Sequence, residues 1–140
     1  MNNRSYFRPD LPETELNAVG VLGLAHVGDA VYEILVRTKL CIENPSKVSQ
    51  LHLLSVSMVN ATAQAKAAHK ILPFLTQEET AVFKRGKNAK VNSIPHNSSV
   101  SEYHFATGLE ALFGWLYLKG KPERVLELFN YGLVELKDGD

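Results

Sequence analysis

Two carboxylates stand where an isolated charge is expensive. Asp29 lies in residues 23–33 (GLAHVGDAVYE), among small and apolar neighbours, and Glu110 is the only Asp, Glu, Lys or Arg in residues 103–118. A buried carboxylate is costly unless it is paired or binds a cation. Each residue therefore has two interpretations. It could cap a neighbouring helix or pair with a buried Arg or Lys, or it could hold a hard cation. Mg²⁺ prefers oxygen ligands, and such an ion can activate water against a phosphodiester.

Small residues flank both carboxylates and would let two helices approach closely: Gly28, Ala30, Ala106, Ala111 and Gly114. Glu33 follows Asp29 by one helical turn on the same face. Glu33 could support the cation site from outside its ligands, or it could pair with Arg37, four residues further on. The spacing slightly favours the salt bridge.

A basic segment, residues 84–90 (KRGKNAK), carries four positive charges, and no Asp or Glu occurs in residues 81–101. The chain as a whole is neutral, with fifteen basic and fifteen acidic residues. Such a local cluster can follow a phosphate backbone. It is equally typical of a solvated helix end, whose negative dipole favours cations. The candidate phosphate-binding side chains are Lys84, Arg85, Lys87, Asn88 and Lys90.

Length and composition indicate one globular domain. The chain has 140 residues, of which 45% are hydrophobic and 21% charged. These values exclude a disordered chain. Cys41 is the only cysteine, so an intramolecular disulfide and a cysteine-rich zinc site are excluded. Because the sequence shows no membrane span and no signal peptide, we expect a cytoplasmic protein that does not bind membranes.

Hydrophobic periodicity predicts helices throughout. Residues 1–12 are expected to form an irregular arm, and residues 13–140 one all-α domain of six or seven helices. Helical spacing extends from Thr14 to about Ile42, and glycines divide it into a short and a longer helix. Asn44 and Pro45 resemble a helix start, so the next helix is expected from Pro45 towards Leu72.

Capping signals mark the later helices. Thr76 with Glu79 and Ser99 with Glu102 both have the spacing of a capping box. The first predicts a helix through about Lys87, and the second predicts an apolar helix that ends near 120. Residues 88–98 are expected to form a loop, and Pro122 to begin the last helix.

The two acidic motifs together resemble the ribonuclease III family. Residues 27–31 (VGDAV) are similar to the LGDAV core of the family's signature helix. Residues 109–118 (LEALFGWLYL) are similar to its second motif, FEALIGAIYL. The similarity covers roughly residues 15–133. No double-stranded-RNA-binding domain is expected after this domain, so the chain resembles the subfamily Mini-ribonuclease III. The basic segment is similar to that subfamily's RGRNAK element.

The resemblance implies an all-α homodimer that cleaves both strands of double-stranded RNA and leaves 5′-phosphate and 3′-hydroxyl ends. It implies that Asp29 and Glu110 are the catalytic metal ligands for Mg²⁺, for which Mn²⁺ can substitute, and that the basic segment binds RNA. The implied substrate is precursor large-subunit (23S) ribosomal RNA, and a ribosomal protein is a further possible partner.

Two positions depart from the full-length family. Ala25 stands where the family has Glu, and Thr107 stands where it has Asp. Two of four carboxylates therefore remain, and one Mg²⁺ per subunit is expected, with Thr107 and Glu33 as residues that could support its ligands. Two alternatives stay open: a non-catalytic RNA-binding or ribosome-assembly protein with this fold, and a metal-dependent nucleotide pyrophosphohydrolase.

Overall fold

The computed structural model describes residues 4–44, 47–90 and 99–133. Over these ranges the chain forms α-helices, one short 3₁₀ helix and no β-strand, which confirms the expected all-α fold. The elements are α1 (Glu13–Ala18), α2 (Val21–Glu43), α3 (Val48–Val59), α4 (Ala61–Ile71), the 3₁₀ helix η1 (Leu72–Phe74), α5 (Gln77–Lys87), α6 (Val100–Leu118) and α7 (Pro122–Leu133).

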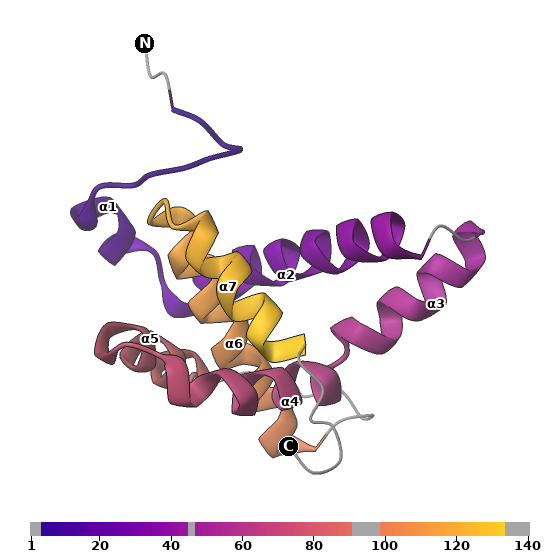
Figure 1. The fold of residues 1–140 in the computed structure, drawn as a ribbon. Helices are drawn as coiled ribbons and strands as arrows, with labels where there is room; N and C mark the ends of the chain where they lie inside the picture. The colour runs from indigo at the N-terminus through magenta and orange to yellow at the C-terminus, as the bar shows by residue number, and fades with distance from the viewer. Residues whose placement is uncertain (1–3, 45–46, 91–98, 134–140) are drawn as a thin grey trace.

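Helix α6 forms the centre of the fold, and α2, α4, α5 and α7 pack around it (Figure 1). Every residue from Ala106 to Leu116 is buried except Glu110, which is half-buried. A helix enclosed on all sides must be apolar around its whole circumference. This explains why residues 103–118 carry a single formal charge, and it makes that charge an exception that needs a reason. None of the described helices, α6 included, is long and apolar enough to cross a membrane.

Helix α2 contributes one continuous buried stripe to the core. Leu24, Tyr32, Val36 and Leu40 recur at multiples of four residues and are at most 6% exposed, as the helical period requires. The Tyr32 ring lies 5.6 Å from that of Phe113 and 5.4 Å from that of Phe129, between centroids. Tyr32 thereby joins α2 to α6 and α7. Figure 1 shows that the end of α2 and the start of α3 lie far from this core, and that the two helices form a V that opens towards it.

The capping boxes predicted from the sequence are both present. The side-chain oxygens of Thr76 and Ser99 accept hydrogen bonds from the backbone of Glu79 and Glu102, and both glutamates bond back to the cap residues. The described part of the arm, residues 4–12, is irregular as expected. Gly20 separates α1 from α2, and Pro122 begins α7.

The prediction of one helix from Pro45 towards Leu72 is wrong, because the chain forms two helices there. Asn60 lies between them with extended backbone (ψ 163°), and its side chain accepts a hydrogen bond of 2.8 Å from the Ala63 backbone N–H. An asparagine with this geometry ends one helix and caps the next. The alanine-rich composition indicated helix throughout, and composition alone does not show where a single cap residue interrupts it.

The predicted start of that helix is also displaced. Lys47, and not Asn44, is the residue before the first turn of α3, while Asn44 closes the end of α2 through its backbone N–H. Residues 45–46 lie outside the described part of the chain, as do residues 91–98 of the predicted loop.

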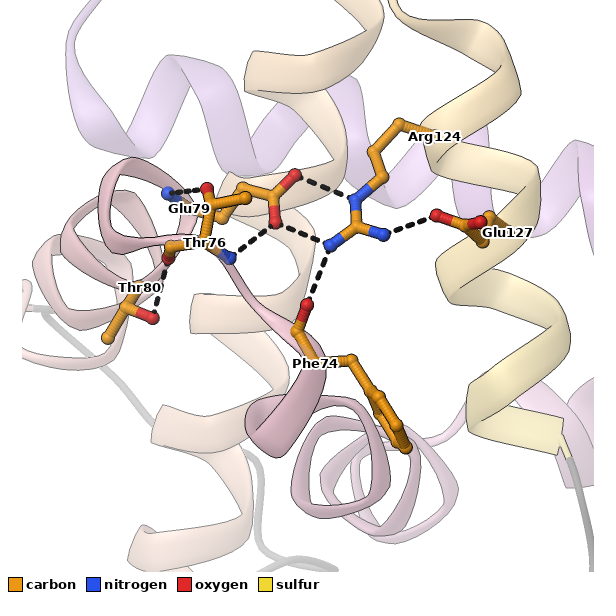
Figure 2. A network of polar contacts seen from close by, with 6 residues as sticks. All are labelled: Phe74, Thr76, Glu79, Thr80, Arg124 and Glu127. Atoms are coloured by element: carbon orange, nitrogen blue, oxygen red, sulfur yellow. Dashed lines mark hydrogen bonds and ion pairs between the residues drawn. The ribbon is translucent and has the colours of Figure 1, made fainter.

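A partly buried ion pair fixes α5 against α7 (Figure 2). Arg124 donates from Nε and Nη2 to the two carboxylate oxygens of Glu79, at 2.8 and 2.7 Å, and from Nη2 to the Phe74 carbonyl at 2.8 Å. Burial raises the pKa of Glu79, but the hydrogen bonds from Arg124 and Thr76 outweigh burial, so that pKa lies below its ordinary value of 4.5. This pair, which sequence analysis missed, holds the helix that ends in the basic segment.

Candidate active site

Helices α2 and α6 cross with their backbones in direct contact. A Cβ added to Gly28 would lie 1.6 Å from the carbonyl oxygen of Glu110, and one added to Gly114 would lie 1.9 Å from that of Leu24. No side chain fits at either glycine. The crossing therefore places Asp29, the residue after Gly28, beside the turn of α6 that carries Glu110.

The carboxyl groups of Asp29 and Glu110 meet at this crossing, 81 positions apart in the sequence. Burial raises the pKa of Glu110, and the hydrogen bond and negative charge of Asp29 raise it further, to about 8. Two carboxylates in contact cannot both ionise without a large cost. In the protein alone, this contact therefore favours the protonated form of Glu110. A cation that removed the repulsion would let both groups ionise.

The donor set suits a hard divalent cation that retains water and substrate ligands. Mg²⁺ is commonly held through one or two carboxylates, and its other positions are filled by waters and phosphate oxygens. Within the described ranges, no three His, Cys, Asp or Glu side chains gather where they could hold a metal ion. Asp29 is exposed and Glu110 is half-buried, so the pair is reachable from solvent. The arrangement fits a cation shared with substrate rather than one enclosed by protein.

Glu33 and Thr107 both have contacts within their own helices. Arg37 Nη2 lies 2.7 Å from Glu33 Oε1, so the favoured salt bridge is present. The Thr107 hydroxyl is buried and donates to the Tyr103 carbonyl oxygen at 2.9 Å. A part for either side chain in supporting the cation ligands stays a prediction.

The basic segment lies beside the same stretch of α6. Gly86 packs against that helix so closely that an added Cβ would lie 2.6 Å from Ala111 Cβ, next to Glu110 in the chain. Lys84 and Arg85, the two preceding residues, are exposed. The basic end of α5 and the helix that carries Asp29 thus both pack against α6, although residues 84–90 and Asp29 are distant in sequence.

The segment continues along the edge of a hollow of about 360 Å³ between the end of α5 and the start of α6. The Lys87 ammonium lies 4.8 Å from the centroid of the Phe105 ring, and His69 stacks on the same ring at 4.2 Å. These contacts hold the Lys87 side chain at the rim. The hollow is lined by Lys87, Asn88, Ser101, His104 and Phe105.

Sequence analysis missed Gln64. This residue of α4 is 3% exposed, and its side chain contacts the Glu110 carboxyl and lowers its pKa. The available signal was a lone amide in residues 61–68 (ATAQAKAA), where the alanines indicate a face that packs closely. That signal is weak, because Gln is an ordinary helix former.

Comparison with known proteins agrees with this architecture. Residues 22–121 match the ribonuclease III domain family. A Mini-ribonuclease 3 from Clostridium tetani is 39% identical over 91% of this chain and 85% of its own length. One from Desulfitobacterium hafniense is 46% identical over 83% of this chain and 71% of its own. A crystal structure of a Fusobacterium nucleatum protein has a TM-score of 0.76 and 32% identity, and covers 83% of this chain and 93% of that one.

The fold and the family match define an endoribonuclease that acts on double-stranded RNA, in a class that generally uses a divalent metal ion. This chain belongs to the ribonuclease III family and, within it, to the Mini-ribonuclease 3 group. Membership confirms the resemblance found in the two acidic motifs. It also decides between the enzyme and the two alternatives, in favour of the endoribonuclease.

Proposed function

We propose that this endoribonuclease holds Mg²⁺ through Asp29 and Glu110 and hydrolyses RNA phosphodiesters beside them. The observation that carries the proposal is the contact of these two carboxyls at the α2–α6 crossing. Mn²⁺, with similar ligand preferences, is expected to substitute. When bound, the ion supplies a Lewis acid that lowers the pKa of water and stabilises charge on the phosphate.

The residues of this chain orient the reacting phosphate and neutralise the charge of the RNA backbone. Asp29 and Glu110 present oxygen ligands from two rigid helices, which fixes where the reacting phosphate must lie. Attack of water on phosphorus with departure of the 3′ oxygen leaves a 5′-phosphate and a 3′-hydroxyl, and the departing oxygen takes up a proton. Lys84, Arg85 and Lys90 neutralise backbone phosphates on either side.

Isosteric substitution of the carboxylates tests the proposal. Asp29→Asn and Glu110→Gln remove a ligand charge with little change of shape, and each should reduce Mg²⁺-dependent cleavage of duplex RNA by at least about a hundredfold. Glu43→Gln is the matched control, because Glu43 lies at the far end of α2 and pairs with Lys39 at 2.8 Å. Full activity in Asp29→Asn would refute the assignment.

The basic segment is proposed to bind the RNA backbone. Lys84, Arg85 and Lys90 are exposed, and Asn88 can donate an amide to phosphate or ribose. Because A-form RNA hides its base edges in a deep, narrow groove, recognition is expected through shape and phosphates. Ala at Lys84, Arg85, Lys87 and Lys90 together should weaken binding and reduce the salt slope by about 3.6, since each of the four duplex contacts contributes about 0.9. An unchanged slope would contradict the assignment.

We propose further that the enzyme is a homodimer that presents one centre to each strand of the duplex. Exposed apolar side chains on α2 support this: Leu22 is 47% exposed, Ile34 57% and Ile42 74%. Isolated exposed apolar residues are ordinary and only contiguous apolar patches mark an interface, so these three side chains are candidates for contacts between two copies. Light scattering at micromolar concentration should give twice the mass of 15.5 kDa. A monomer that cleaves both strands would contradict it.

The proposed substrate is precursor 23S ribosomal RNA in the cytoplasm, with a ribosomal protein as a further partner. Its support is the match to the Mini-ribonuclease 3 group together with the basic segment. Mapping of 5′ ends on ribosomal RNA from cells that lack the protein should reveal extended 23S precursors. The same ends should appear when purified enzyme cleaves that precursor, and addition of ribosomal proteins should test whether one is required.

A further inference from the structure

Helix α4 carries one amide side chain into the interior beside the active site. Gln64 is 3% exposed, and its neighbours Ala65 and Ala68 are 5% and 0% exposed. Helix α4 is fixed at its start by the Asn60 cap and packs along α6. A side chain held in this way has little rotational freedom, so its position relative to Glu110 is set by the fold.

The amide nitrogen of Gln64 has an unmet requirement. Within the described part of the chain, Gln64 Nε2 is buried and makes no hydrogen bond. Leaving a buried N–H donor unpaired costs about 1–3 kcal/mol, and the large majority of buried side-chain polar atoms in proteins are paired. The side chain nevertheless lies against Glu110 and favours the charged form of its carboxyl. A buried donor that lacks a partner thus lies beside the carboxyl oxygens of Glu110, which can accept a hydrogen bond from it.

We propose that Gln64 is a positioning residue for Glu110: Nε2 donates a hydrogen bond to a Glu110 carboxyl oxygen when the cation is bound, and so orients that ligand. This inference rests on the proposed function of Glu110 as a ligand. Hydrogen bonds from neighbouring side chains orient metal-binding carboxylates and tune their affinity.

The chemistry of an amide suits this task. A carboxylate at position 64 would add a third negative charge beside Asp29 and Glu110, and an ammonium would compete with the cation for them. A neutral donor orients the ligand and leaves the charge of the pair unchanged. Ser55 offers a comparison, since its Oγ is also buried with no partner among the described residues, but it lies in α3 and lines a hollow with Arg37 and Leu40.

The test compares cation affinity with stability. Gln64→Met keeps length and volume and removes the donor. Calorimetric titration with Mn²⁺ alone should show affinity at least about tenfold weaker than in the wild type, and the Mg²⁺ concentration for half-maximal cleavage should rise by a similar factor. The melting temperature without metal should stay unchanged or rise, because the lost donor had no partner there. Ser55→Ala, the matched control, should leave the Mn²⁺ affinity unchanged.

A second variant guards against a folding defect. Gln64→Asn retains a buried amide but withdraws it by one methylene, so it should weaken Mn²⁺ binding in the same direction. Affinity within twofold of the wild type in either folded variant overturns the role of Gln64. If the wild-type protein itself binds no Mn²⁺ and Asp29→Asn remains active, the proposed cation site fails instead, so the two failures are distinguishable.

Discussion

Replacement of Gly28 by alanine tests the geometric basis of the active site. The added Cβ would lie 1.6 Å from the Glu110 carbonyl oxygen and 2.8 Å from the Gly114 nitrogen, both of them backbone atoms that cannot rotate away. Real Cβ contacts essentially never fall below 3.0 Å. The contact of 1.6 Å would have to lengthen to at least 3.0 Å. Helices α2 and α6 must therefore separate by about 1.4 Å or tilt by an equivalent amount.

The separation should affect stability and catalysis to different extents. Overpacking costs about 1–3 kcal/mol, and a rigid backbone contact belongs at the upper end of that range. For a domain of this size, about 3 kcal/mol lowers the melting temperature by roughly 10 °C. The carboxylates lie on the two separating helices, and a misplacement of about 1 Å can reduce the rate about a hundredfold. Gly28→Ala should therefore remain poorly active even at temperatures where it is fully folded.

The assay combines thermal unfolding with cleavage of a duplex RNA at least 20 °C below the melting temperature of the variant. Gly23→Ala is the matched control on α2, because its Cβ would meet only Val19 Cγ1 at 3.4 Å, an ordinary contact. That variant should be as active as the wild type and slightly more stable, by up to about 1 kcal/mol, through helix propensity. Gly28→Ala with wild-type stability and a rate within twofold would refute the close crossing of α2 and α6.

Further predictions concern stability and the cation. Because the folded-state pKa of Glu79 lies below its ordinary value of 4.5, its ion pair with Arg124 stabilises the fold above that pH and the contribution is lost as pH falls below it. The difference in unfolding free energy between wild type and Glu79→Gln, from urea titrations, should thus be present at pH 7 and shrink below pH 4.5; a constant difference would contradict the pairing. Asn60→Ala should lower stability by about 1 kcal/mol through loss of the α4 cap, whereas Asn130→Ala, an exposed position in α7, should not. EDTA should abolish cleavage and Mg²⁺ or Mn²⁺ should restore it, while Ca²⁺ should restore it poorly because its looser geometry suits the reacting phosphate less; activity in EDTA would contradict the metal requirement.

The sequence was most informative where a signal is local. Capping boxes depend on residues three positions apart, so Thr76 and Ser99 marked the starts of α5 and α6 correctly. The same locality explains the error around Asn60, where one cap residue divides a segment whose composition is helical throughout. The i, i+4 spacing of Glu33 and Arg37 likewise indicated a salt bridge that the structure contains.

Contacts between distant segments depended on the tertiary structure. The pairing of Glu79 with Arg124 joins two residues that are 45 positions apart, and no local spacing in the sequence indicates it. The unpaired amide of Gln64 becomes significant only when α4 packs beside Glu110. Burial and hydrogen-bond partners are properties of the folded chain, and residue types alone do not specify them.

By itself the sequence determined the all-α fold, the two acidic motifs and the basic segment, because periodicity, capping and motif spacing are written along the chain. Only the tertiary structure decided that Asp29 and Glu110 touch, that Gly28 and Gly114 make this contact possible, and that the basic end of α5 lies against the same helix. The physical reason is that catalysis needs groups placed to within about 1 Å, and backbone packing between helices sets positions at that scale.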